Sequence, residues 1–315
     1  MSYKTQNEPK AGFDPLAPVK AEPNGPSPAP PLSIDAFIPP QMAIKAEDVG
    51  VKKANMDGLT MFALAILAGA FIALGAIFAT TVTAGAGDKL PFGVAKLLGG
   101  LVFSLGLILV VVAGAELFTG NNLIVMAWAD RRVSTWQVVR NWLIVYAGNF
   151  VGSIATAILM FYTKQYTFGS GAMGLNVLNT AHSKSSLDFM QAIALGIMCN
   201  ALVCLAVWLC FSARTTTDKI LSIIFPITAF VAAGFEHSVA NMYFIPIGLL
   251  VKAGAPANFW ETIGKTAADY PNLTWGNFLF ANLLPVTIGN IIGGSVMVGL
   301  VYWFIYIRKT DTAKS

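Results

Sequence analysis

The chain has 315 residues, of which 56% are hydrophobic and only 11% are charged. Soluble globular domains carry roughly a quarter charged residues, so this composition excludes an ordinary soluble protein and indicates a polytopic membrane protein. The formal net charge of +4 gives no footprint for nucleic-acid binding. With two histidines and three cysteines without a CxxC pair, we predict neither a metal site nor a cofactor, and we expect the cysteines to be packing residues.

The amino end is polar and rich in proline, and it lacks a signal peptide. We expect residues 1–42 to be a disordered, retained cytoplasmic arm, which is either an inert tail or a docking site for a soluble partner. Residues 43–56 form a candidate amphipathic helix, since Ile44, Val49 and Val51 lie among lysines. Residues 57–309 are the predicted six-span domain, and 310–315 are a short tail.

Six apolar runs cover residues 59–82, 92–128, 138–163, 187–211, 219–251 and 277–307. A tilted transmembrane helix needs about 20 apolar residues. The second run as one continuous helix would measure about 55 Å at 1.5 Å per residue, against a hydrocarbon core of about 30 Å. The second and fifth runs must therefore be interrupted.

Both long runs contain the same polar pattern, Ala-Gly-x-Glu-x-x-x-x-Asn, at residues 113–121 and 233–241. The following spans also match, because residues 141–152 and 282–293 share Asn, Leu, Val, Gly, Asn and Gly in register. The chain is thus predicted to be two homologous halves of three spans each, and an odd number of spans inverts the second half. The GxxxG spacings Gly148–Gly152 and Gly289–Gly293 predict close helix packing, which we favour within the chain over a contact between subunits.

Glu236 and His237 lie inside the fifth run, which carries no other charge after Lys219. Ionisable groups at membrane depth are costly and mark functional sites. The alternative for His237 is an interior histidine with satisfied hydrogen bonds. For Glu116 and Glu236 we favour a scaffold role, in which each carboxylate holds exposed backbone amides at its helix break. Asn121 and Asn241, at matching positions of the repeat, are expected to be scaffold residues too.

Basic residues indicate the orientation of the spans. One side carries a dense set of them, and the other side carries scattered lysines mixed with acids. The positive-inside rule then places both termini in the cytoplasm. The dense set consists of Lys52, Lys53, Arg131, Arg132, Arg140, Arg214, Lys219, Arg308 and Lys309.

Five motifs together resemble the formate/nitrite transporter family, and within it the bacterial formate channels. They are residues 91–97 (PFGVAKL), 116–119 (ELFT), 141–143 (NWL), 234–242 (GFEHSVANM) and 285–294 (PVTIGNIIGG). The resemblance covers about residues 43–309. It implies an aquaporin-like protomer, a homopentamer with one pore per protomer in the bacterial inner membrane, and transport of formate across the lipid bilayer.

The resemblance also implies roles for single residues. His237 matches the central histidine of the family's pore, and Thr119 matches the hydroxyl on the facing break. Asn200 and Asn290 match pore-lining asparagines, and Lys184 matches a lysine of the outer vestibule. The apolar constrictions correspond to Leu107, Leu117, Phe230 and Phe103. Glu116 departs from the family, in which close relatives carry aspartate.

We hypothesise that His237, hydrogen-bonded to Thr119 or Asn200, donates to the substrate and hands it a proton, so that formic acid crosses. Nitrite, hydrosulfide and lactate are alternative substrates of the same kind. An intramembrane enzyme is disfavoured, because there is no His-Glu-x-x-His spacing and no nucleophile elbow. A neutral-solute channel of the aquaporin type would carry paired Asn-Pro-Ala motifs at its helix breaks, and these motifs are missing. The remaining alternative is a membrane scaffold that acts through the proline-rich arm.

Overall fold

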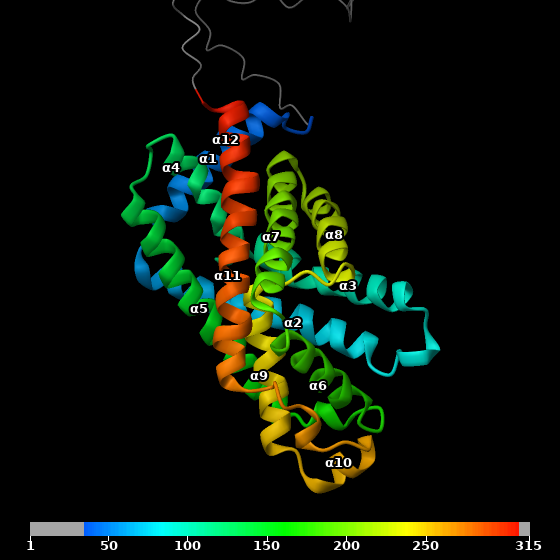
Figure 1. Cartoon of the computed structure of the whole chain (residues 1–315). Helices are drawn as coiled ribbons and strands as arrows, with labels where there is room; N and C mark the ends of the chain where they lie inside the picture. Colours follow the sequence, from blue (N-terminus) through cyan, green and yellow to red (C-terminus); the bar gives the residue numbers. More distant parts are fainter. Residues whose placement is uncertain (1–34, 309–315) are drawn as a thin grey trace, which may run out of the picture. The chain divides into compact units, whose positions relative to one another are not determined.

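The computed structural model describes residues 35–308, so the predicted arm up to residue 34 and the tail 310–315 lie outside the described part. Within residues 35–308 all regular structure is helical (Figure 1). The α-helices are α1 (Pro39–Ala54), α2 (Gly58–Thr83), α3 (Phe92–Ile108), α4 (Val125–Ala129), α5 (Thr135–Tyr162), α6 (Ala172–Ser185), α7 (Phe189–Ser212), α8 (Thr216–Ala232), α9 (Ser238–Gly254), α10 (Ala257–Ile263), α11 (Leu284–Ile291) and α12 (Val301–Tyr306). The 3-10 turns are η1 (Gly87–Lys89), η3 (Gly120–Ile124), η4 (Gln165–Thr167) and η5 (Ala267–Asp269), and the π-helical stretches are η2 (Leu109–Gly114), η6 (Asn277–Leu283) and η7 (Ile292–Leu300).

Five helices of the described part are long and apolar enough to cross a membrane, and counting the bent pair α9 and α10 as one span gives six. Capping residues set where the long helices begin. Asp57 accepts a hydrogen bond from the Thr60 amide at α2, and Ser134 and Asp188 cap α5 and α7 in the same way. Such caps satisfy amides that have no partner within the helix. The predicted all-helical six-span fold is confirmed.

The amphipathic helix α1 begins at Pro39, inside the last residues of the predicted arm, because proline suits the first helical turn. Its buried face differs from the prediction. Met42, Ala43 and Ala46 are buried, whereas Ile44 is 57% exposed. The small residues of this face let α1 lie directly on η3 and α4.

The second and fifth spans are broken where the sequence predicts. The second ends at Gly114 and resumes as a helical turn at Gly120, and the fifth ends at Ala232 and resumes at Ser238. Gly114 and Gly234 have φ of 84° and 74°, a left-handed conformation that glycine adopts without steric cost. The first helix therefore stops at a left-handed glycine in one break and two residues before one in the other, and a short segment that is not helical follows the glycine.

The two halves are equivalent beyond the three spans. Helix α6 lies in what the sequence predicts as a loop, and it precedes the fourth span as α1 precedes the first. The ends of these two helices, Lys53 and Lys184, occupy matching positions. In Figure 1, α1, α4 and α12 lie at one end of the bundle, and α6 and α10 lie at the other. The repeat is thus inverted, as predicted.

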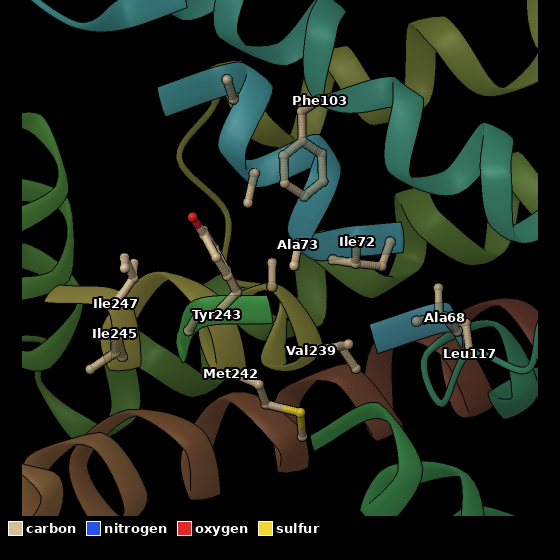
Figure 2. Close-up of a cluster of buried hydrophobic side chains, with 14 of the residues drawn as sticks. Ala68, Ile72, Ala73, Phe103, Leu117, Val239, Met242, Tyr243, Ile245 and Ile247 are labelled. Atoms are coloured by element: carbon tan, nitrogen blue, oxygen red, sulfur yellow. The ribbon is translucent and has the colours of Figure 1, made fainter. Parts of the chain in front are cut away.

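Glycines bring the spans of each half into backbone contact. A Cβ atom at Gly152 would overlap the carbonyl oxygen of Ile66 in α2, and one at Gly293 would overlap the carbonyl oxygen of Ile197 in α7. The GxxxG spacings therefore serve packing within the chain. Around them lies one large apolar cluster, part of which Figure 2 shows: α2 contributes Ala68, Ile72 and Ala73, and α9 contributes Val239, Met242 and Tyr243.

Candidate functional site

The two helix breaks meet at a hydrogen bond between Thr119 and His237. The Thr119 hydroxyl oxygen lies 2.9 Å from His237 Nε2, and both side chains are buried. Thr119 is the last residue of the break in the second span, directly before η3, and His237 is the last residue before α9. One bond therefore joins the breaks of the two halves.

The other ring nitrogen of His237 settles which nitrogen carries the proton. Nδ1 accepts a hydrogen bond of 3.0 Å from the Ala240 amide, so His237 caps helix α9 with its own side chain. An amide N–H can only donate, and Nδ1 must therefore be unprotonated. In this neutral ring Nε2 carries the hydrogen and donates it to Thr119. The hydrogen of the Thr119 hydroxyl has no acceptor among the described side chains and backbone, so the pair can offer donors to a substrate.

Asparagines hold the extended backbone of each break. Asn149 Oδ1 accepts from the Phe118 amide at 2.9 Å, and its Nδ2 donates to the carbonyls of Ala65 and Glu116. Asn290 repeats this arrangement with the Ser238 amide and the carbonyls of Gly196 and Glu236. Backbone groups in a membrane interior must find such partners. Asn290 therefore braces the second break and lines neither of the cavities described below.

The carboxylates of the breaks bind lysines, which corrects the prediction that they hold backbone amides. Glu116 Oε1 lies 2.8 Å from Lys53 Nζ, and its Oε2 accepts from Asn121 at 2.7 Å. Glu236 Oε1 lies 2.7 Å from Lys184 Nζ, and its Oε2 accepts from Asn241 at 2.6 Å. The lysines come from the ends of α1 and α6, so each pair ties an amphipathic helix to a break.

A second asparagine completes each of these networks. Asn121 donates to Asn141 Oδ1, and Asn141 donates to the Lys53 carbonyl. Asn241 and Asn282 make the equivalent bonds, which end at the Lys184 carbonyl. Asn121 and Asn241 were predicted from the repeat, whereas Lys53 was not predicted to be a partner of Glu116. The repeat could have identified Lys53, because Lys53 and Lys184 lie at the same distance before the first and fourth spans.

Two cavities approach the Thr119–His237 bond from opposite ends of the bundle. The α6-side cavity, of about 450 Å³, is lined by residues of α6, by His237 and by Lys184. The α1-side cavity, of about 430 Å³, is lined by residues of α1 and by Glu116 and Lys53. A third cavity of about 500 Å³ near α10 contains none of the predicted site residues.

The four predicted constriction residues lie between these cavities. Phe103 and Phe230 line the α6-side cavity, with ring centroids 5.7 Å apart, and Phe230 stacks on His237 at 6.0 Å. Leu107 and Leu117 line the α1-side cavity. Phe103 and Leu107 are four residues apart on α3, which is about 6 Å of helix rise. A thin apolar partition therefore separates the two cavities.

The remaining predicted pore residue, Asn200, is fully buried and lines neither cavity. Its Nδ2, with two hydrogens to donate, lies within hydrogen-bond distance of the carbonyls of Thr119 and Asn290 and of Asn122 Oδ1. Asn200 thus fixes the backbone of Thr119. Because the equivalent position in the first half is Gly69, the repeat alone gives no sign of this role.

Six-span protomers built as inverted repeats, with broken helices at their centre, form a class of membrane transport proteins. This chain belongs to the formate/nitrite transporter family, whose sequence model matches residues 40–304. It is 48% identical over 277 residues to the formate channel FocA of Escherichia coli strain K12, covering 88% of this chain and 97% of that one. The formate channel FocA of Haemophilus influenzae is 44% identical over 280 residues, which are 89% of this chain and 97% of that protein.

Solved structures agree with this placement. A pentameric formate channel with formate bound is 48% identical, with a TM-score of 0.75 over 80% of this chain and 98% of that one. An ion channel of the same family, at 28% identity, gives a TM-score of 0.71 over 84% of this chain and 98% of that one.

Proposed function

We propose that this protein transports formate across a membrane, through the two cavities and the partition between them. The observation that carries the proposal is the hydrogen bond between Thr119 and His237, which lies at the meeting point of the two breaks. The relatives named as formate channels, and the solved channel with formate bound, support the choice of substrate.

The chemistry of the substrate explains why donors are needed at this point. Formate is a small carboxylate that must give up much of its hydration to pass Leu107, Leu117, Phe103 and Phe230. An unpaired charge in an apolar passage costs many kcal/mol, whereas hydrogen bonds offset part of that cost. In this proposal Nε2–H of His237 and the Thr119 hydroxyl turn from each other to the substrate oxygens.

Proton transfer from His237 requires a second proton on the ring. A neutral ring that lost its Nε2 proton would become an imidazolate, so the donor in any transfer is the doubly protonated ring. Its extra proton sits on Nδ1 and displaces the Ala240 amide. We assign hydrogen-bond donation to the neutral ring, and crossing as formic acid to the doubly protonated one.

The surroundings of the protein belong to the same proposal. We place it in the bacterial inner membrane with both termini in the cytoplasm, since Lys45, Lys52, Lys53 and Lys219 all line the α1-side cavity. Lys184 then lies on the outer side. We propose a homopentamer, by analogy with the solved pentameric channel. Deleting residues 1–34 tests the arm: lost transport would indicate regulation, and lost partner binding alone would indicate scaffolding.

Stopped-flow uptake of formate, nitrite and hydrosulfide into proteoliposomes at two pH values tests the substrate. We expect formate to enter fastest, and Thr119→Val to slow it by at least about tenfold, because the variant keeps the shape but loses a buried hydrogen-bond partner. Thr119→Ser, which keeps the hydroxyl, is the matched control. Faster nitrite or hydrosulfide uptake would reassign the substrate within the family, and equal rates for Thr119→Val and the parent would remove this pair from the pathway.

A further inference from the structure

The two cavities differ in charge. Lys45, Lys52, Lys53 and Lys219 line the α1-side cavity together with a single acid, Glu116, which leaves three positive charges in excess. In the α6-side cavity Lys96 and Lys184 face Glu236, which leaves one. The positive-inside rule accounts for lysines on this side of the membrane. It does not account for three of them lining one cavity without a paired acid, and that arrangement calls for a separate explanation.

Three of the four lysines have no carboxylate partner within residues 35–308. Lys53 pairs with Glu116, but Lys45 Nζ donates only to the Phe211 carbonyl, at 3.0 Å, and lies 4.7 Å from the ring centroid of Phe37. Lys52 and Lys219 make no ion pair in the described part. Burial and repulsion from Lys219 and Arg214 lower the pKa of Lys45. Lys45 and Lys219 are thus close enough to repel each other, and they line one cavity with Lys52, without a carboxylate partner in the described part.

The acids nearest in sequence are already engaged. Asp218 caps α8, accepting from the amides of Thr215 and Arg214 at 2.9 and 3.2 Å. Glu47 and Asp48 both approach Arg132, at 3.4 and 2.8 Å. The positive charge at this cavity is therefore available to a ligand from outside the chain.

We propose that the α1-side cavity binds a soluble dianion of the phosphate class at Lys45, Lys52 and Lys219, and that the bound dianion blocks formate entry from that side. A tetrahedral oxyanion offers acceptors to several ammonium groups at once. It cannot continue inward, because Leu107 and Leu117 close the inner end of the cavity and two charges would have to be desolvated there. The dianion thus binds in the α1-side cavity but does not pass the apolar partition.

Direct binding tests the site without reference to transport. The full-length protein in detergent is titrated with inorganic phosphate by calorimetry at constant ionic strength. We expect Lys45→Gln/Lys219→Gln to weaken binding by about tenfold, since two nearby charges are lost, and the exposed Lys52→Gln to weaken it less. Lys96→Gln, the same change in the other cavity, should bind as the parent does. Absent binding, or equal binding by the parent and the double variant, would overturn the site.

The block rests on the formate transport proposed above and is measured separately. Formate flux is recorded in vesicles of both orientations, with phosphate, or sulfate as a dianion that does not titrate, on one face only. We expect phosphate and sulfate each to slow formate flux several-fold when present on the α1 side alone. The double variant should require about tenfold higher concentrations of either dianion for the same slowing. Equal slowing from both faces, or none, would overturn the block. A protein with no formate flux would fail the proposed function and leave the calorimetric test of the site intact.

A lipid phosphate has the same chemistry as a soluble one, and vesicle composition separates the two sources. Vesicles of phosphatidylcholine alone are compared with vesicles that also contain phosphatidylglycerol. A soluble ligand predicts that added phosphate slows flux in both. If phosphatidylglycerol slows flux by itself and added phosphate then has no effect, the ligand is a lipid headgroup and the proposal is wrong.

Discussion

Tyr146 of α5 and Thr287 of α11 hold equivalent positions in the two halves, and their hydroxyl oxygens lie 2.8 Å apart. The register follows from Asn141 and Asn149, which match Asn282 and Asn290. When equivalent residues of an inverted repeat touch each other, its pseudo-two-fold axis passes between them. Thr287 donates to the Leu283 carbonyl at 2.6 Å, so Tyr146 is the donor in the bond across the axis.

The bond on the axis should show an asymmetric response to mutation. Tyr146→Phe removes the donor and leaves Thr287 bonded to Leu283, so we expect a loss of about 1 kcal/mol in the free energy of unfolding. Thr287→Val leaves the half-buried Tyr146 hydroxyl without its acceptor and should lower the free energy of unfolding by about 2 kcal/mol. Thermal unfolding in detergent compares the two, and the opposite ranking would contradict the assignment of donor and acceptor.

The pair of Lys184 and Glu236 should stabilise the link between α6 and the second break. Lys184→Met leaves the Glu236 carboxylate, whose side chain is only 6% exposed, without its cation. We expect a loss of about 3 kcal/mol, because an unpaired buried charge is costly. Lys96→Met, with no acid partner in the described part, should change stability by less than about 0.5 kcal/mol. Adding Glu236→Gln to Lys184→Met should restore most of the loss, and a double variant as unstable as the single one would argue against the pair.

The glycine contacts predict that both halves respond alike. Gly152→Ala and Gly293→Ala would each push a methyl group into a carbonyl oxygen of the neighbouring span, of Ile66 and Ile197 respectively. We expect each to cost roughly 2 kcal/mol, as overpacking does. Gly93→Ala in α3 is the control, since no atom lies within 4 Å of its added Cβ. A variant of either glycine as stable as Gly93→Ala would mean that the spans do not pack this closely.

Glu47 of α1 should make stability depend on pH. Burial, together with the neighbouring Asp130 carboxylate and despite the nearby Arg132, raises the pKa of Glu47 above its ordinary value of 4.5. An acid whose pKa is higher in the folded protein adds stability that is fully present below pH 4.5 and is lost as the pH rises through the folded value. The stability of Glu47→Gln relative to the parent, measured by thermal unfolding, should therefore increase between pH 4 and pH 7. A parallel pH profile for Glu47→Gln and the parent would contradict the ionisation of a buried Glu47 over this range.

Much of the architecture could be predicted because the internal repeat is recognisable in the amino-acid sequence. The two Ala-Gly-x-Glu-x-x-x-x-Asn patterns located both breaks, and the matched asparagines of the third and sixth spans fixed the inversion. The membrane requires every backbone group to find a partner, which makes such breaks rare and therefore recognisable.

The partners inside the site could not be predicted in the same way. Lys53 and Lys184 reach carboxylates more than fifty residues away, and only the fold brings α1 and α6 to the breaks. Asn290, singled out as a pore residue, instead braces the backbone as Asn149 does. The apolar face of α1 was misjudged because alanine and glycine, which carry little hydrophobic signal, are what the close contact requires.

We propose above all that the Nε2–H of His237 donates a hydrogen bond to the substrate between the two cavities. Stopped-flow formate uptake into proteoliposomes across a range of pH, with the parent, His237→Phe and His237→Ala, tests it most directly. The account predicts that both variants differ from the parent in rate by at least about tenfold, as loss of a buried hydrogen-bonding group implies, and in the shape of the pH profile. Unchanged rates and profiles in both variants would contradict it.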